Sequence, residues 1–329
     1  MRRRTLVSGL GAGLGAAAAG WLPGAGPMAA FAQTPGRVYR LGHLTSAESS
    51  AAATRDFTLP ELARLGFAEG RNLVFDSRVG EADALPGLMR DLLATRPDAV
   101  IAVGHPAVAA AGAATRSVPI VTFGADPTQI GLAAGYARPG GNVTGVVILN
   151  TELEVKRLSI LREALPERRR VAVLSSPTTE LGDAALRDAA AGLGAELLVF
   201  SVAAPSDYAA AFAAMRAAGA QALLIGAALE FFRDGRQLAA LALEARLPTI
   251  CQWAEMAHAG CLIGYGPSRA ALRKRMASQL AQLFRGVAPA DIAIERPTVF
   301  EFAVNQTVAR ALDLRLADAS LMAADELIE

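Results

Sequence analysis

Polar residues follow the ends of several apolar, strand-length runs in this sequence. Asp126 comes directly after the buried run 119–123 and before Pro127. Ligands of open parallel sheets bind beside the carboxyl ends of the strands, so a carboxylate here can accept hydrogen bonds from a ligand ammonium or hydroxyl. Alternatively, Asp126 is the N-cap of a helix that we expect over 128–137. Both roles are compatible with the sequence.

Similar candidates follow the other expected strands. The hydroxyls of Thr45 and Ser46, with nearby backbone N–H groups, could hold a carboxylate or form a plain turn. Trp253 and Tyr265 could stack on a ligand or pack in the core. Glu230 is either a polar ligand contact or an exposed acid in the first turn of a helix. The candidate ligand-binding residues are Thr45, Ser46, Gly104, His105, Asp126, Ser175, Ser176, Thr178, Gly226, Glu230 and Trp253.

Motifs for other kinds of chemistry are absent from the sequence. His43, His105 and His258 lack the spacing of metal ligands, and neither a phosphate-binding loop nor G-x-S-x-G occurs. The segment 11–16 fits the dinucleotide fingerprint G-x-G-x-x-A, but no strand precedes it. We therefore expect no catalytic residue, no metal and no cofactor.

Composition bounds the class of protein. The chain has 329 residues, 53% of them hydrophobic and 19% charged, which is enough for two folded domains. The net charge is +1, and no basic stripe with interleaved aromatic residues occurs, so nucleic acid is not an expected partner. Cys251 and Cys261 could form one disulfide or remain two separate buried thiols.

The N-terminus has the pattern of an export signal. Arg2, Arg3 and Arg4 precede a mildly apolar Gly/Ala-rich segment, and a small-x-small site predicts cleavage after Ala32. Consecutive arginines with weak apolarity favour the twin-arginine route over the general secretory route. Cleavage removes three arginines and no acid, which leaves a formal charge of −2. No later stretch reaches about 18 apolar residues, so we expect a soluble periplasmic protein without direct membrane insertion.

After this segment, strands alternate with helices, a pattern that favours parallel sheets. The first series of strands is expected at 38–44, 72–78, 98–103, 119–123 and 142–147. The second is expected at 170–174, 195–200, 220–225 and 248–252, followed by extra strands at 261–265 and 300–304. A T-x-x-E capping box at 151–154 predicts the start of one helix, and Ser268 predicts the N-cap of another.

Two such series predict an α/β fold of two doubly wound parallel-sheet lobes joined by a three-segment hinge. We expect lobe 1 to comprise 38–145 and 260–287, and lobe 2 to comprise 146–255 and 296–329. The crossings between lobes are expected near 142–147, 253–261 and 286–300.

Several motifs resemble one family. These are 69–73 (EGRNL), 138–146 (RPGGNVTGV), 264–266 (GYG), 297–301 (PTVFE) and 324–329 (ADELIE). In this order behind an export signal, they resemble bacterial ABC-transporter substrate-binding proteins related to the tryptophan-binding TrpX group. The resemblance implies a type I periplasmic-binding fold that closes on a small molecule, often an aromatic amino acid, and docks on a membrane permease. We expect a monomer.

Two segments depart from the family pattern. Residues 57–62 (FTLPEL) make the first helix look shortened, and 226–232 (GAALEFF) lacks the Asp-Pro that relatives tend to carry. Both adjoin the expected cleft, so the resemblance does not carry a relative's ligand to this chain.

Two other functions fit the same fold class. A ligand-sensing extracellular module would need a transmembrane segment or a signalling domain. An enzyme on a doubly wound fold would need a nucleotide loop in the mature chain or a nucleophile–base pair. The sequence shows neither set of features.

Overall fold

The computed structural model describes residues 36–177, 179 and 183–329. The expected export segment with its cleavage site after Ala32, and the candidate Thr178, lie outside these residues. Within the described part of the chain, every helix is too short or too polar to span a bilayer.

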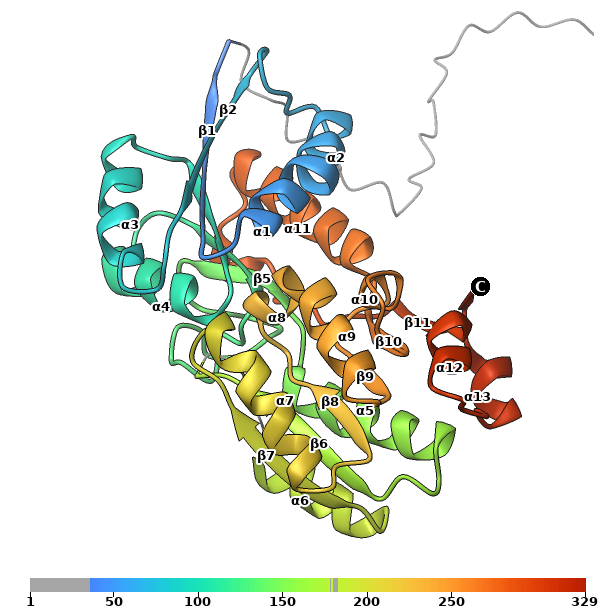
Figure 1. Ribbon diagram of the computed structural model, residues 1–329. Helices are drawn as coiled ribbons and strands as arrows, with labels where there is room; N and C mark the ends of the chain where they lie inside the picture. Colours follow the sequence, from blue (N-terminus) through green and yellow to red (C-terminus); the bar gives the residue numbers. More distant parts are fainter. Residues whose placement is uncertain (1–35, 178, 180–182) are drawn as a thin grey trace, which may run out of the picture. The chain divides into compact units, whose positions relative to one another are not determined.

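The first lobe contains a five-stranded parallel sheet in the order β2-β1-β3-β4-β5. Figure 1 shows β1 and β2 side by side. Its strands are β1 (Tyr39–Thr45), β2 (Leu73–Val79), β3 (Ala99–Val103), β4 (Ile120–Gly124) and β5 (Val143–Val147). All five residues of β3 are buried. Such continuous apolar runs suit a strand that is covered on both faces.

Helices cover both faces of this sheet. Val100 and Ala102 of β3 belong to the core formed with α3 (Leu85–Ala94) and α4 (His105–Ala114). Ile101 and Val103 point to the opposite core, because successive strand residues alternate between faces. That core is covered by α1 (Glu48–Ala53), the π-helical turn η1 (Thr54–Thr58), α2 (Leu59–Arg64) and α11 (Arg269–Phe284).

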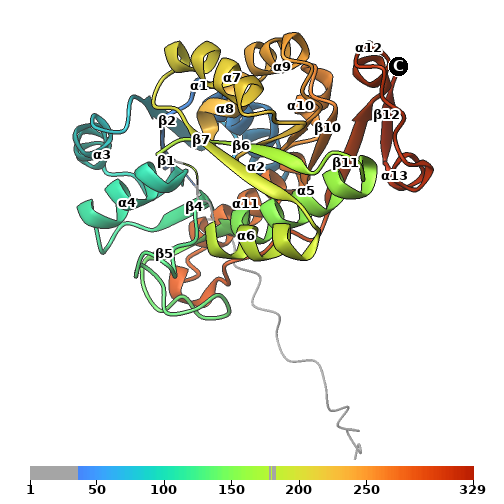
Figure 2. The ribbon, with the colours of Figure 1, turned by 60° about the horizontal axis from the view of Figure 1, so that its bottom comes forward.

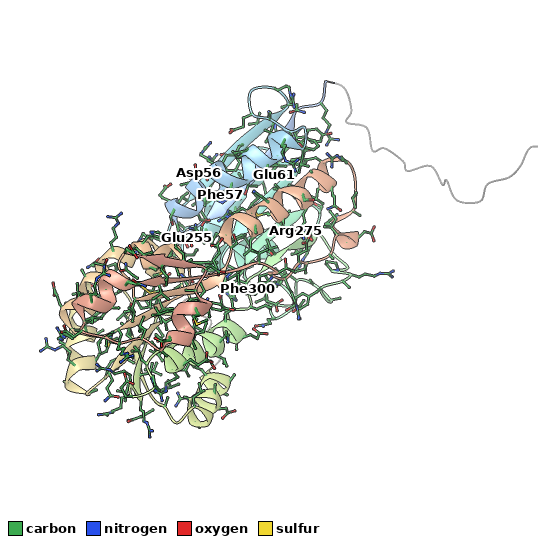
Figure 3. All side chains as sticks on the ribbon, turned by 90° about the vertical axis from the view of Figure 1, so that its right-hand side faces the viewer. Asp56, Phe57, Glu61, Glu255, Arg275 and Phe300 are labelled. Carbon is green, nitrogen blue, oxygen red and sulfur yellow. A yellow bond between two sulfur atoms is a disulfide. The ribbon has the colours of Figure 1, made fainter. Side chains whose placement is uncertain are left out.

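The helix α11 lies alongside η1 and α2, which carry Asp56, Phe57 and Glu61 (Figure 3). It begins at Ser268, whose side chain accepts a hydrogen bond from Ala271 N, as expected for an N-cap. It therefore adds a late part of the chain to the first lobe.

The first helical segment runs over residues 48–64 with a π turn in its middle. The N–H of Leu59 donates to the carbonyl of Thr54, five residues earlier. Pro60 lies inside this run, just after the π turn, and has no N–H to donate to a carbonyl of the preceding turn. The segment that looked shortened in the sequence is therefore a continuous helical run.

The prediction of a helix over 128–137 is wrong. These residues form turns, and the backbone of Gly131 has φ +71°. Leu132 fills the space above Gly112, where a Cβ would lie 2.4 Å from the leucine Cδ1. Packing of this loop onto α4 thus replaces regular helical hydrogen bonding.

The second lobe contains a seven-stranded sheet in the order β12-β11-β10-β9-β8-β6-β7. Its strands are β6 (Arg170–Ser175), β7 (Glu196–Ser201), β8 (Ala222–Ile225), β9 (Thr249–Cys251), β10 (Ile263–Pro267), β11 (Phe300–Asn305) and β12 (Glu326–Ile328). Only the β10–β11 pair is antiparallel among the described neighbours. The sequence did not indicate β12.

Helices also enclose this sheet from both sides, as Figure 2 shows for β6 and β7. One face packs on α5 (Asn150–Ala164) and α6 (Asp183–Gly192). The other packs on α7 (Tyr208–Ala217) and α9 (Gly235–Glu244). Shorter helices complete the lobe: η2 (Pro205–Asp207), α8 (Leu229–Arg233), α10 (Glu255–His258), α12 (Gln306–Ala311) and α13 (Asp318–Ala323).

The prediction of a capping box at 151–154 is also wrong. The N-cap of α5 is Leu149, in a left-handed conformation with φ 61°. Glu154 is buried inside the helix instead of reaching back to its start. Its carboxylate has a different partner, described below.

Three segments connect the two sheets. The first segment links β5 to α5. The third runs from α11 through η3 (Pro289–Asp291) to β11, and on the way its residue Glu295 forms an isolated β-bridge with Val146 of β5. We expected the second crossing near 253–261 and lobe 1 to include 260–287. However, β10 pairs with β9 and β11 in the seven-stranded sheet, and the chain leaves that sheet only between Pro267 and α11. We therefore propose 267–269 as the second crossing.

Candidate functional site

A cavity, here called the interlobe cavity, lies between the two lobes where strands of both sheets end. From the first lobe it is lined by Ser46 after β1, Gly104 after β3 and Ala125 after β4. From the second lobe, Ala227 follows β8 and Gln252 follows β9. These are the carboxyl ends of parallel strands, the place where open α/β sheets bind ligands.

The helix α11 supplies two arginines to the cavity wall. Arg269 and Arg273 share one helix face because they are four residues apart. Arg273 is buried, and its guanidinium carbon lies 4.0 Å from the centre of the Phe123 ring. Its amino groups donate to Thr54 Oγ1 at 2.6 Å and to Ser50 Oγ at 3.0 Å. Burial, followed by repulsion from Arg269, lowers the pKa of Arg273 to about 9.

A buried histidine supports the hydroxyl that holds Arg273. His43 Nε2 lies 3.3 Å from Thr54 Oγ1, and its Nδ1 lies 3.0 Å from Ser77 Oγ. Because Thr54 Oγ1 also donates to the Ser50 carbonyl at 3.0 Å, the consistent assignment has Nε2 as the donor to Thr54. Burial, then the charges of Arg273 and Arg55, lowers the pKa of His43 to about 3. His43 is therefore neutral at physiological pH.

Aromatic side chains form another part of the wall. The guanidinium carbon of Arg269 lies 4.1 Å from the Phe232 ring centre and 5.7 Å from that of Trp253. Arg269 also pairs with Glu255 at 3.4 Å. Burial lowers the pKa of Arg269, and Glu255 opposes that shift. Two aromatic rings beside a guanidinium make a surface that suits a flat or apolar ligand group.

A buried ion pair fixes the second-lobe side of the cavity. Glu154 Oε1 lies 3.5 Å from Arg157 Nη1 and accepts a hydrogen bond from Ala227 N at 2.8 Å. Arg157 Nη2 donates to the Gln252 carbonyl at 3.2 Å. Burial raises the pKa of Glu154 and lowers that of Arg157, while their mutual attraction opposes both shifts. The pair thus holds two backbone segments that line the cavity.

Five residues from the sequence-based set line the interlobe cavity. They are Ser46, Gly104, His105, Glu230 and Trp253. Trp253 is buried at 6% exposure, and Glu230 Oε1 accepts a hydrogen bond from Ser176 Oγ at 2.6 Å. Ser176 lines an adjoining hollow together with Ser46 and Glu230.

Other candidates lie outside the cavity. Thr45 is buried, and its hydroxyl accepts from the backbone N–H two residues later at 3.2 Å. Ser175 donates to a carbonyl of β7 at 3.4 Å. Gly226 packs so tightly that a Cβ would lie 2.8 Å from the carbonyl of Leu174. These three contacts serve the local backbone.

Asp126 also lies outside the residues that line the cavity. Its carboxylate accepts hydrogen bonds from the backbone N–H of Thr128 at 2.9 Å, from the Thr128 hydroxyl at 2.7 Å and from Tyr136. Burial alone would raise the pKa of Asp126, but the hydrogen bonds from Tyr136 and Thr128 outweigh it and lower that pKa. Because residues 128–137 are not helical, Asp126 closes a turn and does not cap a helix.

The two arginines of α11 were missed from the sequence. A signal existed, because Arg269 and Arg273 continue the stripe of Met276 and Leu280 at helical spacing. An arginine on a buried stripe is unusual unless it is paired.

The cysteines are joined in a disulfide between Cys251 and Cys261, both fully buried. It lies beside Gln252 and Trp253 in the chain and so ties this wall to the start of β10. Among the described residues, no group of three or more histidine, cysteine or acidic residues could hold a metal ion.

Comparisons with known proteins agree with this architecture. The family model of the ABC transporter substrate binding protein matches residues 48–328. A conserved domain protein from Vibrio cholerae is 22% identical with a TM-score of 0.80, covering 88% of this chain and all of that one. The ABC domain from Streptococcus pneumonia in complex with L-Trp is 18% identical, also with a TM-score of 0.80 and the same coverage.

Two further relatives come from clostridia. The ligand-free, open structure of a substrate-binding protein with adhesive properties from Clostridium difficile has a TM-score of 0.64 and 18% identity, over 89% of this chain and 99% of that one. A tyrosine-binding protein from Clostridioides difficile (strain R20291) is 26% identical over 113 residues. That match spans about a third of each chain, 33% of this one and 32% of the relative.

The strand order, the cavity at the carboxyl ends of both sheets and the match over most of the chain agree with the resemblance found in the sequence. This chain belongs to the ABC transporter substrate-binding protein family.

Proposed function

We propose that this protein is the exported solute-binding component of an ABC importer. It takes up a small molecule in the interlobe cavity and delivers it, as a monomer, to a membrane permease. The observation that carries the proposal is the position of this cavity, which residues from both lobes line. A ligand that contacts both lobes stabilises the closed arrangement, and the closed form is the one that a permease can recognise.

The proposed ligand is an amino acid. Two relatives support this class, since one was solved with L-Trp and another is a tyrosine-binding protein. The cavity offers aromatic surface at Trp253 and Phe232, together with charged groups of both signs at Arg273 and Glu230. An amino acid has matching parts, with an apolar side chain, a carboxylate and an ammonium group.

The protein acts by binding, with no chemical change in its ligand. The histidine His43 is locked between hydroxyls, and Glu230 bonds to Ser176. Membership of a substrate-binding protein family supports a role in binding. The role of the site is then to discriminate among solutes by fit and charge.

The proposal is tested with mature protein, residues 33–329, purified from the periplasm. Native mass spectrometry should detect one bound small molecule per chain, which denaturation then releases for identification. Calorimetric titration with that molecule should give a dissociation constant in the micromolar range or tighter. Protein that carries no small molecule and binds no amino acid would contradict the proposal.

A further inference from the structure

We propose that Arg273 is the anchor for a carboxylate of the bound solute, so that this site selects small carboxylic acids over neutral sugars. The inference rests on the proposed solute-binding function and adds the residue that recognises the carboxylate of the ligand.

Arg273 lines the interlobe cavity although only 1% of its surface is exposed. Two of the five N–H donors of its guanidinium bond to neutral hydroxyls, those of Thr54 and Ser50. Its Nε has no hydrogen-bond partner among the described residues. A buried cation with donors to spare favours an anion more strongly than a surface cation does.

Two neighbouring arginines, the buried Arg157 and the partly exposed Arg269, have carboxylates beside them. Arg157 pairs with Glu154, and Arg269 pairs with Glu255. Arg273 is absent from the ion pairs formed by the described residues. Leaving a buried charge uncompensated is costly, so a ligand carboxylate supplies what the protein itself does not.

The geometry of the group suits a planar anion. Phe123 stacks on one face of the guanidinium, and the two hydroxyls of the first helical segment hold its amino groups. This leaves little freedom to lose on binding, and a fixed planar fork matches the two oxygens of a carboxylate. Glu230 on the second lobe also lines the cavity, and its negative charge disfavours a doubly charged phosphate.

The test compares acids with their amides. Mature protein is titrated calorimetrically with the twenty L-amino acids, the amides of those that bind, simple monocarboxylates, neutral hexoses and inorganic phosphate. Loss of a charged hydrogen-bond partner typically weakens ligand affinity by about 10- to 150-fold. We expect the best acid to bind at least about tenfold more tightly than its amide.

Two variants assign this preference to Arg273. In Arg273→Met, the dissociation constant of the amide divided by that of the acid should fall to near one, because methionine keeps most of the side-chain volume and has no charge. Lys274→Met removes one positive charge from the exposed side of the same helix turn and should keep the wild-type ratio. The acid-to-amide ratio of the wild type needs no variant, so it tests the inference even if Arg273→Met does not fold.

Different failures have different meanings. Equal binding of acid and amide, or selective binding of a hexose or phosphate, would overturn the carboxylate anchor and leave the solute-binding function intact. An acid preference that survives in Arg273→Met would overturn the assignment to this residue. Absence of binding by every compound, with no small molecule released on denaturation, would contradict the proposed function and this inference together.

Discussion

Gly104 and Leu229 meet across the interlobe cavity, one from each lobe. A Cβ built on Gly104 would lie 2.9 Å from Leu229 Cδ1, and the glycine has φ +81° and ψ 160° at the N-cap of α4. Only glycine adopts such a backbone readily. Leu229 is the first residue of α8 in the second lobe. The contact therefore depends on how closely the lobes approach.

The first prediction concerns this contact. Gly104→Ala should weaken ligand affinity, since the added methyl pushes against Leu229 when the lobes meet. Because the leucine Cδ1 is the end of a flexible side chain, we expect a cost to closure of only about 1 kcal/mol. Left-handed backbone strain should add a cost of about 1–3 kcal/mol to folding.

A double-mutant cycle separates the two effects. Adding Leu229→Ala to Gly104→Ala should restore the affinity lost through the clash and leave the loss of melting temperature in place. Calorimetric titration and thermal unfolding of all four proteins measure this. If Leu229→Ala restores none of the affinity, the contact does not limit closure.

The second prediction concerns pH and His43. Its pKa is about 3 in the folded protein, where burial and the nearby arginines oppose its charge, against about 6.5 in an unfolded chain. Between these values the unfolded chain binds a proton that the folded protein does not, so stability falls as pH falls. The contribution lost between neutral pH and pH 5 is about 2 kcal/mol.

Urea unfolding of wild type and His43→Asn at pH 7.5 and pH 5 provides the measurement. Protonation of carboxylates between pH 7.5 and pH 5 changes the stability of both proteins alike, whereas only the wild type has the imidazole of His43. The free energy of unfolding should therefore fall about 2 kcal/mol further in the wild type. Parallel losses in the two proteins would show that His43 is not the neutral, buried group described here.

The third prediction concerns the buried pair of Glu154 and Arg157. Glu154→Gln leaves the buried charge of Arg157 without its partner, so the free energy of unfolding should fall by about 3–5 kcal/mol. The exposed pair of Arg170 and Glu196, at 3.0 Å, is a matched control. Glu196→Gln should cost less than about 1 kcal/mol. Equal effects of the two substitutions in urea unfolding would contradict the role assigned to the buried pair.

The fourth prediction concerns export. If the N-terminal segment uses the twin-arginine route, replacing Arg2, Arg3 and Arg4 with lysine should leave the precursor in the cytoplasm. Fractionation and immunoblotting follow its location, and N-terminal sequencing of exported wild type should begin at Gln33. Undiminished export of the lysine variant would point to the general secretory route.

Regular elements with strong local patterns were predictable. The strand Ala99–Val103 is one apolar run that is buried on both faces, and the stripe of Leu272, Met276 and Leu280 marks one face of α11. In both cases the burial pattern follows directly from the period of the element. Such elements made the two-lobe α/β fold accessible from the sequence.

Features that depend on distant contacts were not predictable. Residues 128–137 have the length of a helix, but the packing of Leu132 over Gly112 and the turn closed by Asp126 determine their conformation. The proposed crossing at 267–269 depends on the pairing of β10 with β11, which lie far apart in the chain. Arg273 enters the site because α11 folds back onto the first lobe.

The most direct test of the account is a crystal structure of the mature protein purified with its natural small molecule. We predict one ligand in the interlobe cavity, in contact with residues of both lobes and with its carboxylate on the guanidinium of Arg273. A ligand bound elsewhere, or one that contacts a single lobe, would contradict the account.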